Sequence, residues 1–249
     1  MSEPILVTDD GGIRTIRMNR PEKKNALTLA MYGAMASALR EASSADATRC
    51  VKFAGAPGAF CAGNDIADFL AAGAGDGLDL RAVAFLKSLA ESRKPMVAAV
   101  GGVAVGVGTT MLLHCDHVVA AADATFSTPF LKLGLIPEAA STMLAPARMG
   151  YARAFAMLAM GRPLSAQEAK DAGIVNTVTE AADVESVALK AAQEIAALPP
   201  GALAIARTLM RGSPGPVVKQ IEAETTHFRE LIGSDEARAA FQAFLARKK

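Results

Sequence analysis

The chain has 249 residues and 51% of them are apolar, enough to bury the core of one large domain or of one domain with a helical extension. The formal net charge is +1, only 5% of the residues are aromatic and none is tryptophan, so the composition argues against a nucleic-acid-binding protein. Three cysteines in a chain of this length indicate free thiols in a reducing compartment, and we expect a cytoplasmic protein.

Short strands alternate with helices along the first part of the chain. Strands are predicted at 5–8, 12–18, 50–54, 96–100, 117–121, 124–127 and 174–178, and helices at 28–42, 78–92, from about 107, 149–160, 165–171 and 182–197. This alternation is typical of an α/β core with buried, largely parallel strands. Beyond the junction at 198–201 the pattern is helical only, at 201–211, 216–231 and 234–246. We therefore expect an α/β core at 1–195 and a helical C-terminal region at 196–249.

The segment 95–115 carries no Asp, Glu, Lys or Arg and is long enough to span a bilayer. It also contains four glycines and a histidine, which membrane spans rarely combine. We interpret it as a buried strand, a glycine turn and a buried helix. The N-terminal residues show no secretory signal, and we expect no membrane partner.

One carboxylate, Glu138, directly follows an apolar run and Pro137. Proline and acidic residues are both favoured in the first turn of a helix, so we expect Glu138 to open a helix that continues through Leu144. A carboxylate held among small and apolar neighbours is suited to act as a base in proton transfer. The alternative is a helix-start glutamate stabilised by the helix dipole.

Two glycine-bearing turns follow predicted strands, the first turn at 59–66 and the second turn at 101–108. Such turns let the backbone approach a ligand closely, and each leads into a predicted helix with free N–H groups. Side by side they would aim two N–H groups at one oxygen, an oxyanion hole suited to a thioester carbonyl that becomes an enolate. Ordinary strand-to-helix turns are the alternative. Neither turn is a dinucleotide fingerprint, and the three histidines show no metal-ligand spacing, so no cofactor or metal is expected.

Four ordered motifs extend over essentially the whole chain. They are Asn19-Arg20-Pro21-Glu22-Lys23-Lys24-Asn25-Ala26-Leu27, Phe60-Cys61-Ala62-Gly63-Asn64-Asp65, Lys94-Pro95-Met96-Val97-Ala98-Ala99-Val100 and Gly161-Arg162-Pro163-Leu164-Ser165-Ala166-Gln167-Glu168-Ala169. In order and spacing the set resembles the crotonase superfamily, also called the enoyl-CoA hydratase/isomerase family. The resemblance implies a crotonase-like ββα spiral core with a helical C-terminal region and a function in fatty acid metabolism. It also implies homotrimers or dimers of trimers, and an acyl-CoA thioester substrate that brings its own CoA.

Position by position, the resemblance assigns roles to particular residues. The N–H groups of Asn64 and Val107 would form the oxyanion hole, although Val107 stands where the family usually has glycine. The CoA-contacting positions correspond to Lys24, Asn25, Ala26 and Leu27, to Ala62, Asp65 and Ile66 along the pantetheine and adenine region, and to Phe244 and Lys248 near the C-terminus. We also expect apolar C-terminal side chains, among them Phe228, Leu231, Phe241 and Phe244, to bury surface against another subunit.

The departures from the family pattern indicate the reaction. The two glutamates of typical enoyl-CoA hydratases correspond here to Thr110 and Phe130, and neither is a carboxylate. Glu138 matches the single base of the family's delta-3,delta-2-enoyl-CoA isomerases. We therefore expect an isomerase in which Phe130 and Leu135 line the acyl pocket. The alternatives are a hydratase or other crotonase-type lyase with a second acid such as Asp68, and a non-catalytic acyl-CoA-binding homologue.

Overall fold

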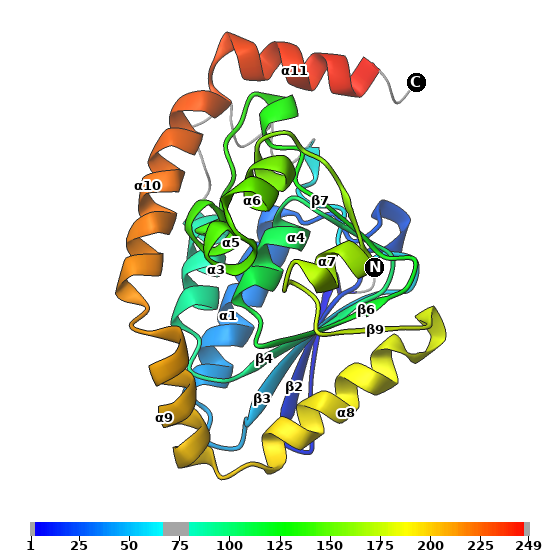
Figure 1. Ribbon diagram of the computed structural model, residues 1–249, viewed down its shortest axis with the longest axis vertical. Helices are drawn as coiled ribbons and strands as arrows, with labels where there is room; N and C mark the ends of the chain where they lie inside the picture. Colours follow the sequence, from blue (N-terminus) through cyan, green and yellow to red (C-terminus); the bar gives the residue numbers. More distant parts are fainter. Residues whose placement is uncertain (1–2, 67–79, 247–249) are drawn as a thin grey trace.

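The computed structural model describes residues 3–66 and 80–246 of the chain. Its main sheet has six strands in the order β1-β2-β3-β4-β6-β9 (Figure 1). These strands are β1 (Ile5–Asp10), β2 (Ile13–Met18), β3 (Cys50–Gly55), β4 (Met96–Val100), β6 (His117–Ala121) and β9 (Thr177–Thr179). The β1–β2 hairpin is antiparallel and every other pair is parallel. The apolar runs of β3 and β4 are buried along nearly their whole length, as parallel strands covered on both faces require.

A second, three-stranded sheet has the order β5-β7-β8 and consists of β5 (Val103–Val105), β7 (Thr125–Ser127) and β8 (Leu164–Ser165). β5 lies inside the second turn, where we expected only a turn, and β8 was also missed. Strands this short carry too few residues to show a two-residue periodicity. Gly102, at φ 76°, connects β4 to β5 and so joins the two sheets.

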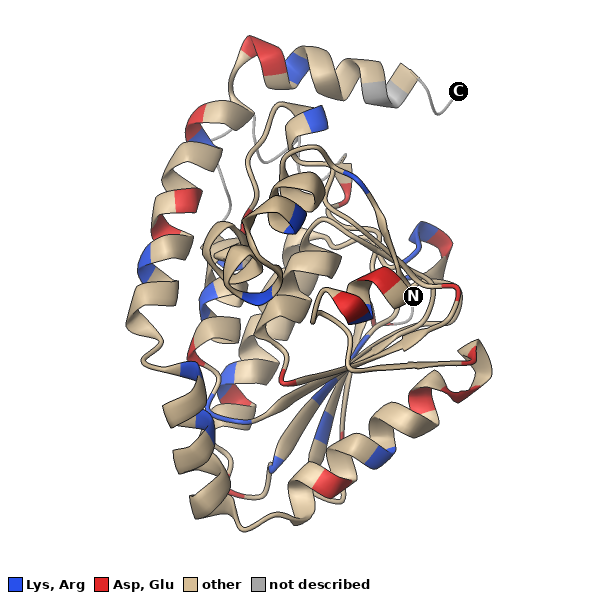
Figure 2. Ribbon diagram, in the orientation of Figure 1, with Lys and Arg blue, Asp and Glu red and all other residues tan. Residues whose placement is uncertain are grey.

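The helices surround these sheets. They are α1 (Leu29–Ser44), α3 (Leu80–Glu91), α4 (Val107–Thr110), α5 (Ser141–Met149), α6 (Tyr151–Leu158), α7 (Ala166–Asp171), α8 (Val184–Ala197), α9 (Pro200–Arg211), α10 (Gly215–Ile232) and α11 (Asp235–Ala246). Short 3-10 turns lie at η1 (Pro21–Lys23), η2 (Met111–His114), η3 (Leu131–Leu133) and η4 (Ala181–Asp183). α8 packs against β3, β4 and β6, and α1 contacts β1 and β2. Figure 2 shows charged residues along the outer helices α8 and α10 but none on α4 at the centre.

Three sequence-based boundaries were wrong for identifiable reasons. The helix expected at 149–160 is α6, which begins only at Tyr151 because Gly150, with φ 77° and ψ 156°, separates it from α5. The strand expected at 174–178 begins only at Thr177, because the side chain of Asn176 turns back to accept a hydrogen bond from the Val118 N–H. The buried helix expected from about 107 is one turn of α4 followed by the 3-10 turn η2.

The C-terminal helices α9 and α10 run along one side of the molecule, and α11 lies across its top (Figure 1). α10 packs on α3, and α11 crosses over η3 at the top of the view in Figure 1. Phe228 and Phe241, expected to be buried by another subunit, are 1% and 3% exposed within the single chain, so that expectation is corrected for both. Leu231 packs partly against the same apolar cluster. Among the described residues, no helix is both long and apolar enough to cross a membrane.

Candidate active site

The first and second turns pack directly against each other. Cys61 pairs with Ala104 as an isolated parallel bridge, in which the Cys61 N–H donates to the Val103 carbonyl at 3.1 Å and the Val105 N–H donates to the Cys61 carbonyl at 2.9 Å. Gly63 continues the contact, since a Cβ there would lie 3.0 Å from the Val105 carbonyl oxygen. The backbones that follow β3 and β4 therefore meet, as the two turns were expected to do.

Asn64 directs its own N–H away from its strand partner. It pairs with Leu27 in a parallel bridge, where the Leu27 N–H donates to the Gly63 carbonyl and the Asp65 N–H to the Leu27 carbonyl, both at 2.8 Å. In this pattern the neighbours of Asn64 make the hydrogen bonds to Leu27 and the Asn64 N–H points to the opposite side. Among the described residues, neither the Asn64 N–H nor the Val107 N–H donates a hydrogen bond.

Asn64 and Val107 line one cavity of about 120 Å³, which we call the site cavity. Its polar wall is backbone of the two turns, and Val107 is the first residue of α4. Its apolar wall comes from distant parts of the chain and includes Phe130, Leu133, Leu135, Phe228 and Phe241. A cavity with an apolar wall and a few free donors is typical of a small-molecule site.

Gly108 marks how closely the turns approach. A Cβ at this position would lie 2.7 Å from the Cys61 carbonyl oxygen and 2.8 Å from the Cys61 Cβ, closer than such atoms pack. We expect Gly108→Ala to lower the free energy of unfolding by about 1–3 kcal/mol, because the two turns must move apart. Urea denaturation measures this change.

Gly101→Ala is the matched control for this measurement, because a Cβ on Gly101, in the same turn, would meet no heavy atom within 4 Å. Equal stability of the Gly108→Ala and Gly101→Ala variants would show that the turns are not packed as tightly as the structure has them.

Glu138 does not open a helix, contrary to our expectation. Ala139 and Ala140 follow it in the left-handed region, at φ 64° and 53°, and α5 begins only at Ser141. A helix needs right-handed backbone at every position, so two consecutive left-handed residues separate Glu138 from α5. The Glu138 carboxyl is thus presented from a bend between η3 and α5.

The Glu138 carboxyl is desolvated. The residue is 6% exposed, and its Oε1 has no hydrogen-bond partner within the described part of the chain. Burial, and then the nearby charge of Glu224, raise the pKa of this carboxyl from 4.5 to about 8. A carboxylate with so high a pKa is a stronger base than an exposed glutamate.

Tyr32 connects Glu138 to the site cavity. Glu138 is not among the described residues that line the cavity, but its charge reaches both Cys61 and Tyr32 and helps to raise their pKa values. Tyr32 lies on α1 and is only 2% exposed. Its hydroxyl donates a hydrogen bond to Asn64 Oδ1 at 2.5 Å. The base and the tyrosine are both buried, and the tyrosine hydroxyl contacts the half-buried Asn64, which offers the free N–H.

The remaining predicted contact residues fall into different environments. Lys24 is exposed, whereas Asn25 is fully buried and donates its side-chain amide to the Ala56 and Ala59 carbonyls. Ala26 accepts a hydrogen bond from Arg20, and Leu27 is 2% exposed beside Asn64. The structure brings Ala62, Ile66, Phe130 and Leu135 to the site cavity, and Asp65 forms an ion pair with Arg20 at 2.6 Å. Lys248, Asp68 and the side chain of Phe244 lie outside the described residues.

Sequence reasoning missed several residues of this region. Near Glu138 these are Tyr32 and Glu224, which interact with it electrostatically, and His114, which contacts the next residue, Ala139. On the wall of the site cavity they are Phe228 and Phe241. Tyr32 could have been found from the sequence, because it places a hydroxyl on the apolar face of α1. A buried tyrosine hydroxyl needs a hydrogen-bond partner, which indicates a polar group next to it. The signal for His114 is absent from the sequence, because its role is to hold distant backbone: its Nε2 lies 2.8 Å from the Ala139 carbonyl oxygen.

Two larger hollows, of about 410 and 480 Å³, lie along α9, away from Glu138. Both include Arg207, whose Nε donates to Asp116 at 3.0 Å and whose Nη1 donates to the Ser92 carbonyl at 2.7 Å. These contacts hold α9 against the core. In the described chain no group of three His, Cys, Asp or Glu side chains is arranged to hold a metal ion.

Comparison with known proteins gives matches over nearly the whole chain. A family profile described as enoyl-CoA hydratase/isomerase matches residues 8–249. Enoyl-CoA delta isomerase 2 of Rattus norvegicus is 38% identical over 99% of this chain, which spans only 64% of that protein's length. The 1,2-epoxyphenylacetyl-CoA isomerase of Escherichia coli (strain K12) is 32% identical, with 100% of this chain and 97% of that protein covered. The crystal structure of an enoyl-CoA hydratase/isomerase from Pseudoalteromonas atlantica T6c superposes with a TM-score of 0.93 at 36% identity, covering 98% of each chain.

Proposed function

The chain belongs to the enoyl-CoA hydratase/isomerase family, and on this premise we propose that it is an isomerase that moves the double bond of a 3-enoyl-CoA thioester to the 2-position. Both the family and the crotonase-like α/β fold expected from the sequence motifs are confirmed. The choice of an isomerase within the family rests on the chemistry of the site.

The observation that carries the proposal is the buried carboxyl of Glu138, whose Oε1 has no hydrogen-bond partner among the described residues, together with a cavity lined by Asn64 and Val107, whose N–H groups make no hydrogen bond within the described part of the chain. Thr110 and Phe130, which correspond to the two glutamates of typical hydratases, carry no carboxylate. Hydration asks one group to activate water and another to deliver a proton, whereas double-bond migration needs only one base. Glu138, with no carboxylate at position 110 or position 130, therefore favours migration.

The proposed reaction uses Glu138 twice. The thioester oxygen accepts hydrogen bonds from the N–H groups of Asn64 and Val107, which makes the protons on C2 more acidic. Glu138 removes one of them, and the electron pair passes into a dienolate whose negative oxygen remains on these donors. The Glu138 carboxylic acid then returns the proton to C4, so that the C3–C4 double bond becomes a C2–C3 double bond and the carboxylate is regenerated. CoA is part of the substrate, and we propose no further cofactor.

A panel of thioesters tests this function. We expect the protein to convert 3-enoyl-CoA thioesters to 2-enoyl-CoA thioesters, and to add water to 2-enoyl-CoA far more slowly. Because the rat and Escherichia coli relatives are named for different isomerisations, the panel includes both straight-chain and aromatic thioesters. Hydration of crotonyl-CoA at ordinary enzymatic rates would favour a hydratase, and tight binding without any proton exchange would favour a non-catalytic homologue.

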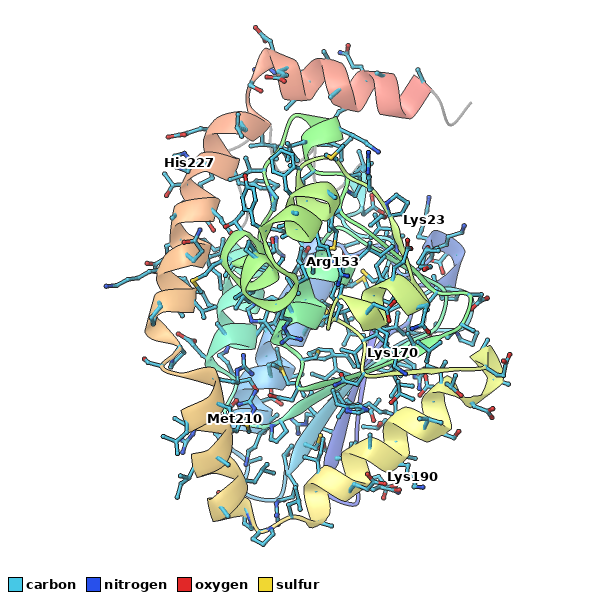
Figure 3. All side chains as sticks on the ribbon, in the orientation of Figure 1. Lys23, Arg153, Lys170, Lys190, Met210 and His227 are labelled. Atoms are coloured by element: carbon cyan, nitrogen blue, oxygen red, sulfur yellow. The ribbon has the colours of Figure 1, made fainter. Side chains whose placement is uncertain are left out.

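We also propose that CoA is contacted by the exposed loop around Lys24 and that the helical C-terminal region takes part in assembly as a trimer or a dimer of trimers. Support for assembly comes from α9, where Ile205, Leu209 and Met210 are 65%, 79% and 79% exposed. Figure 3 labels Met210 on this helix at the side of the molecule. Several large apolar side chains exposed on one helix are typical of an interaction surface.

Light scattering at micromolar concentration measures this assembly. We expect a mass of three or six chains for the wild type, and a lower mass for Leu209→Asp combined with Met210→Asp, because charge on α9 opposes burial of that surface. Lys190→Asp, on the charged helix α8, is the control and should leave the mass unchanged (Figure 3). A stable wild-type monomer would contradict the proposed assembly.

A further inference from the structure

We infer that Glu224, on the C-terminal helix α10, is a positioning residue that fixes the backbone after Glu138 and strengthens Glu138 as a base. The inference deepens the proposed isomerase function and rests on it. It follows from the hydrogen bonds that Glu224 makes, from the conformation that those bonds hold, and from the charges around Glu138.

Glu224 caps a helix to which it does not belong. It is 4% exposed, and its Oε2 accepts a hydrogen bond from the Ala140 N–H at 2.6 Å. Its Oε1 accepts from the Thr142 N–H at 3.1 Å and from the Thr142 hydroxyl. The N-cap position of α5 is Ala140, which has no side chain able to accept these bonds. A carboxylate from another element therefore satisfies the free N–H groups at the start of α5.

These bonds hold a disfavoured backbone in place. Left-handed backbone is unfavourable for alanine, so Ala139 and Ala140 keep their conformation only if the surroundings fix it. Two side chains from distant elements do so: His114 of η2 holds the Ala139 carbonyl, and Glu224 holds the Ala140 N–H. Because Ala139 directly follows the base, this pair determines where the Glu138 carboxyl points.

The charge of Glu224 is the second part of the effect. Tyr32 of α1, Cys61 of the first turn and His114 of η2 also lie around Glu138. Burial raises the pKa of Tyr32 well above 10 and that of Cys61 to about 12, and lowers the pKa of His114 to about 4, so all three are uncharged at neutral pH. Burial raises the pKa of Glu224, whereas the hydrogen bonds that it accepts from Thr142 and from the Ala140 N–H act in the opposite direction and favour its charged form. Among the described groups, the like charge that opposes ionisation of Glu138 therefore belongs to Glu224.

The same helix also reaches the substrate side of the site. Phe228 follows Glu224 by one helical turn, on the same face of α10, and lines the site cavity. α10 therefore contacts both the acyl-binding wall and the backbone that carries the base. Through Glu224, the position of the C-terminal region bears on the strength and the direction of the base.

The test is the pH profile of isomerisation in Glu224→Gln. Glutamine keeps the shape and an acceptor oxygen but removes the charge, so the pKa of Glu138 should fall. We expect the acid limb of the kcat/KM profile to move down by about one pH unit. The plateau at high pH should fall several-fold because Glu138 becomes a weaker base. The wild-type and variant profiles should therefore cross, which a purely structural role would not produce.

Glu222→Gln is the matched control, because Glu222 lies on the same helix, is exposed, and forms an ion pair with Lys87 at 2.6 Å. Its profile should coincide with that of the wild type. An acid limb that stays unmoved in a folded Glu224→Gln protein would overturn the inference, whereas a wild type without isomerisation would overturn the proposed function instead.

A pH titration followed by carboxyl ¹³C NMR measures the pKa of Glu138 without any turnover. The Glu138 signal is assigned as the one that is absent from the spectrum of Glu138→Gln. In the wild type, the Glu138 signal should show a second inflection where Glu224 titrates, a reading that does not depend on the folding of Glu224→Gln. A Glu138 signal with a single inflection would contradict the inferred coupling between the two carboxyl groups.

Discussion

Replacing Glu138 by glutamine should reduce the isomerisation of a 3-enoyl-CoA by about a hundred- to ten-thousand-fold, the usual contribution of a well-placed general base. Glutamine keeps the size and polarity of the side chain but cannot remove the C2 proton. Binding of the thioester should survive, because Asn64 and Val107 offer backbone N–H groups that the substitution leaves in place. Steady-state kinetics and calorimetric binding of an unreactive acyl-CoA measure the two effects separately.

Glu138→Asp distinguishes position from charge. It retains a carboxylate but shortens the side chain, and a displacement of about 1 Å can reduce the rate roughly a hundred-fold. We expect this variant to be partly active at best. Wild-type turnover by Glu138→Gln would place the base elsewhere and contradict the proposed mechanism.

Val107→Pro should reduce kcat by about a hundred- to a thousand-fold, the usual effect of losing one oxyanion donor. Proline removes the N–H of Val107 alone, and it is tolerated at the first position of a helix, where Val107 lies in α4. Within the described residues the Val107 N–H donates no hydrogen bond, so its removal costs the fold no hydrogen bond. The measurement is the rate of single turnover at saturating 3-enoyl-CoA.

Val107→Ala separates the donor from the packing of the side chain, because Val107 is 1% exposed and both substitutions remove its isopropyl group. The alanine variant keeps the N–H and should retain most of the activity. Equal rates for folded Val107→Pro and Val107→Ala would show that this N–H does not stabilise the enolate.

The part of the fold that the sequence predicts is the part with strong local signals. The mostly apolar run of β3 and the uncharged run of β4 identify buried strands, and Ser165 with Glu168 forms the capping box that begins α7. The glycines of the two turns predicted the close approach near Cys61, because only glycine fits there. At each of these positions, local sequence and tertiary packing favour the same structure.

Other features depend on contacts between distant parts of the chain. Alanine gives no sign of left-handed backbone, so Ala139 and Ala140 appeared to continue a helix. Glu224 holds this conformation from a position 84 residues beyond Ala140. In the sequence, Glu224 looks like one of the polar residues that face solvent on its helix. Phe228 and Phe241 looked like subunit contacts because an apolar helix face does not reveal whether its partner is the same chain or another.

The central proposal is that Glu138 alone carries the proton from C2 to C4, and the most direct measurement is to follow a label along this path. A 3-enoyl-CoA deuterated at C2 is converted by the wild type in ordinary water, and the product is analysed by NMR. Because the Glu138 carboxyl is buried, we predict that a measurable share of the deuterium arrives at C4, and that Glu138→Gln shows neither transfer nor exchange. Product whose C4 carries only solvent hydrogen, formed at equal rates by the wild type and Glu138→Gln, would contradict the account.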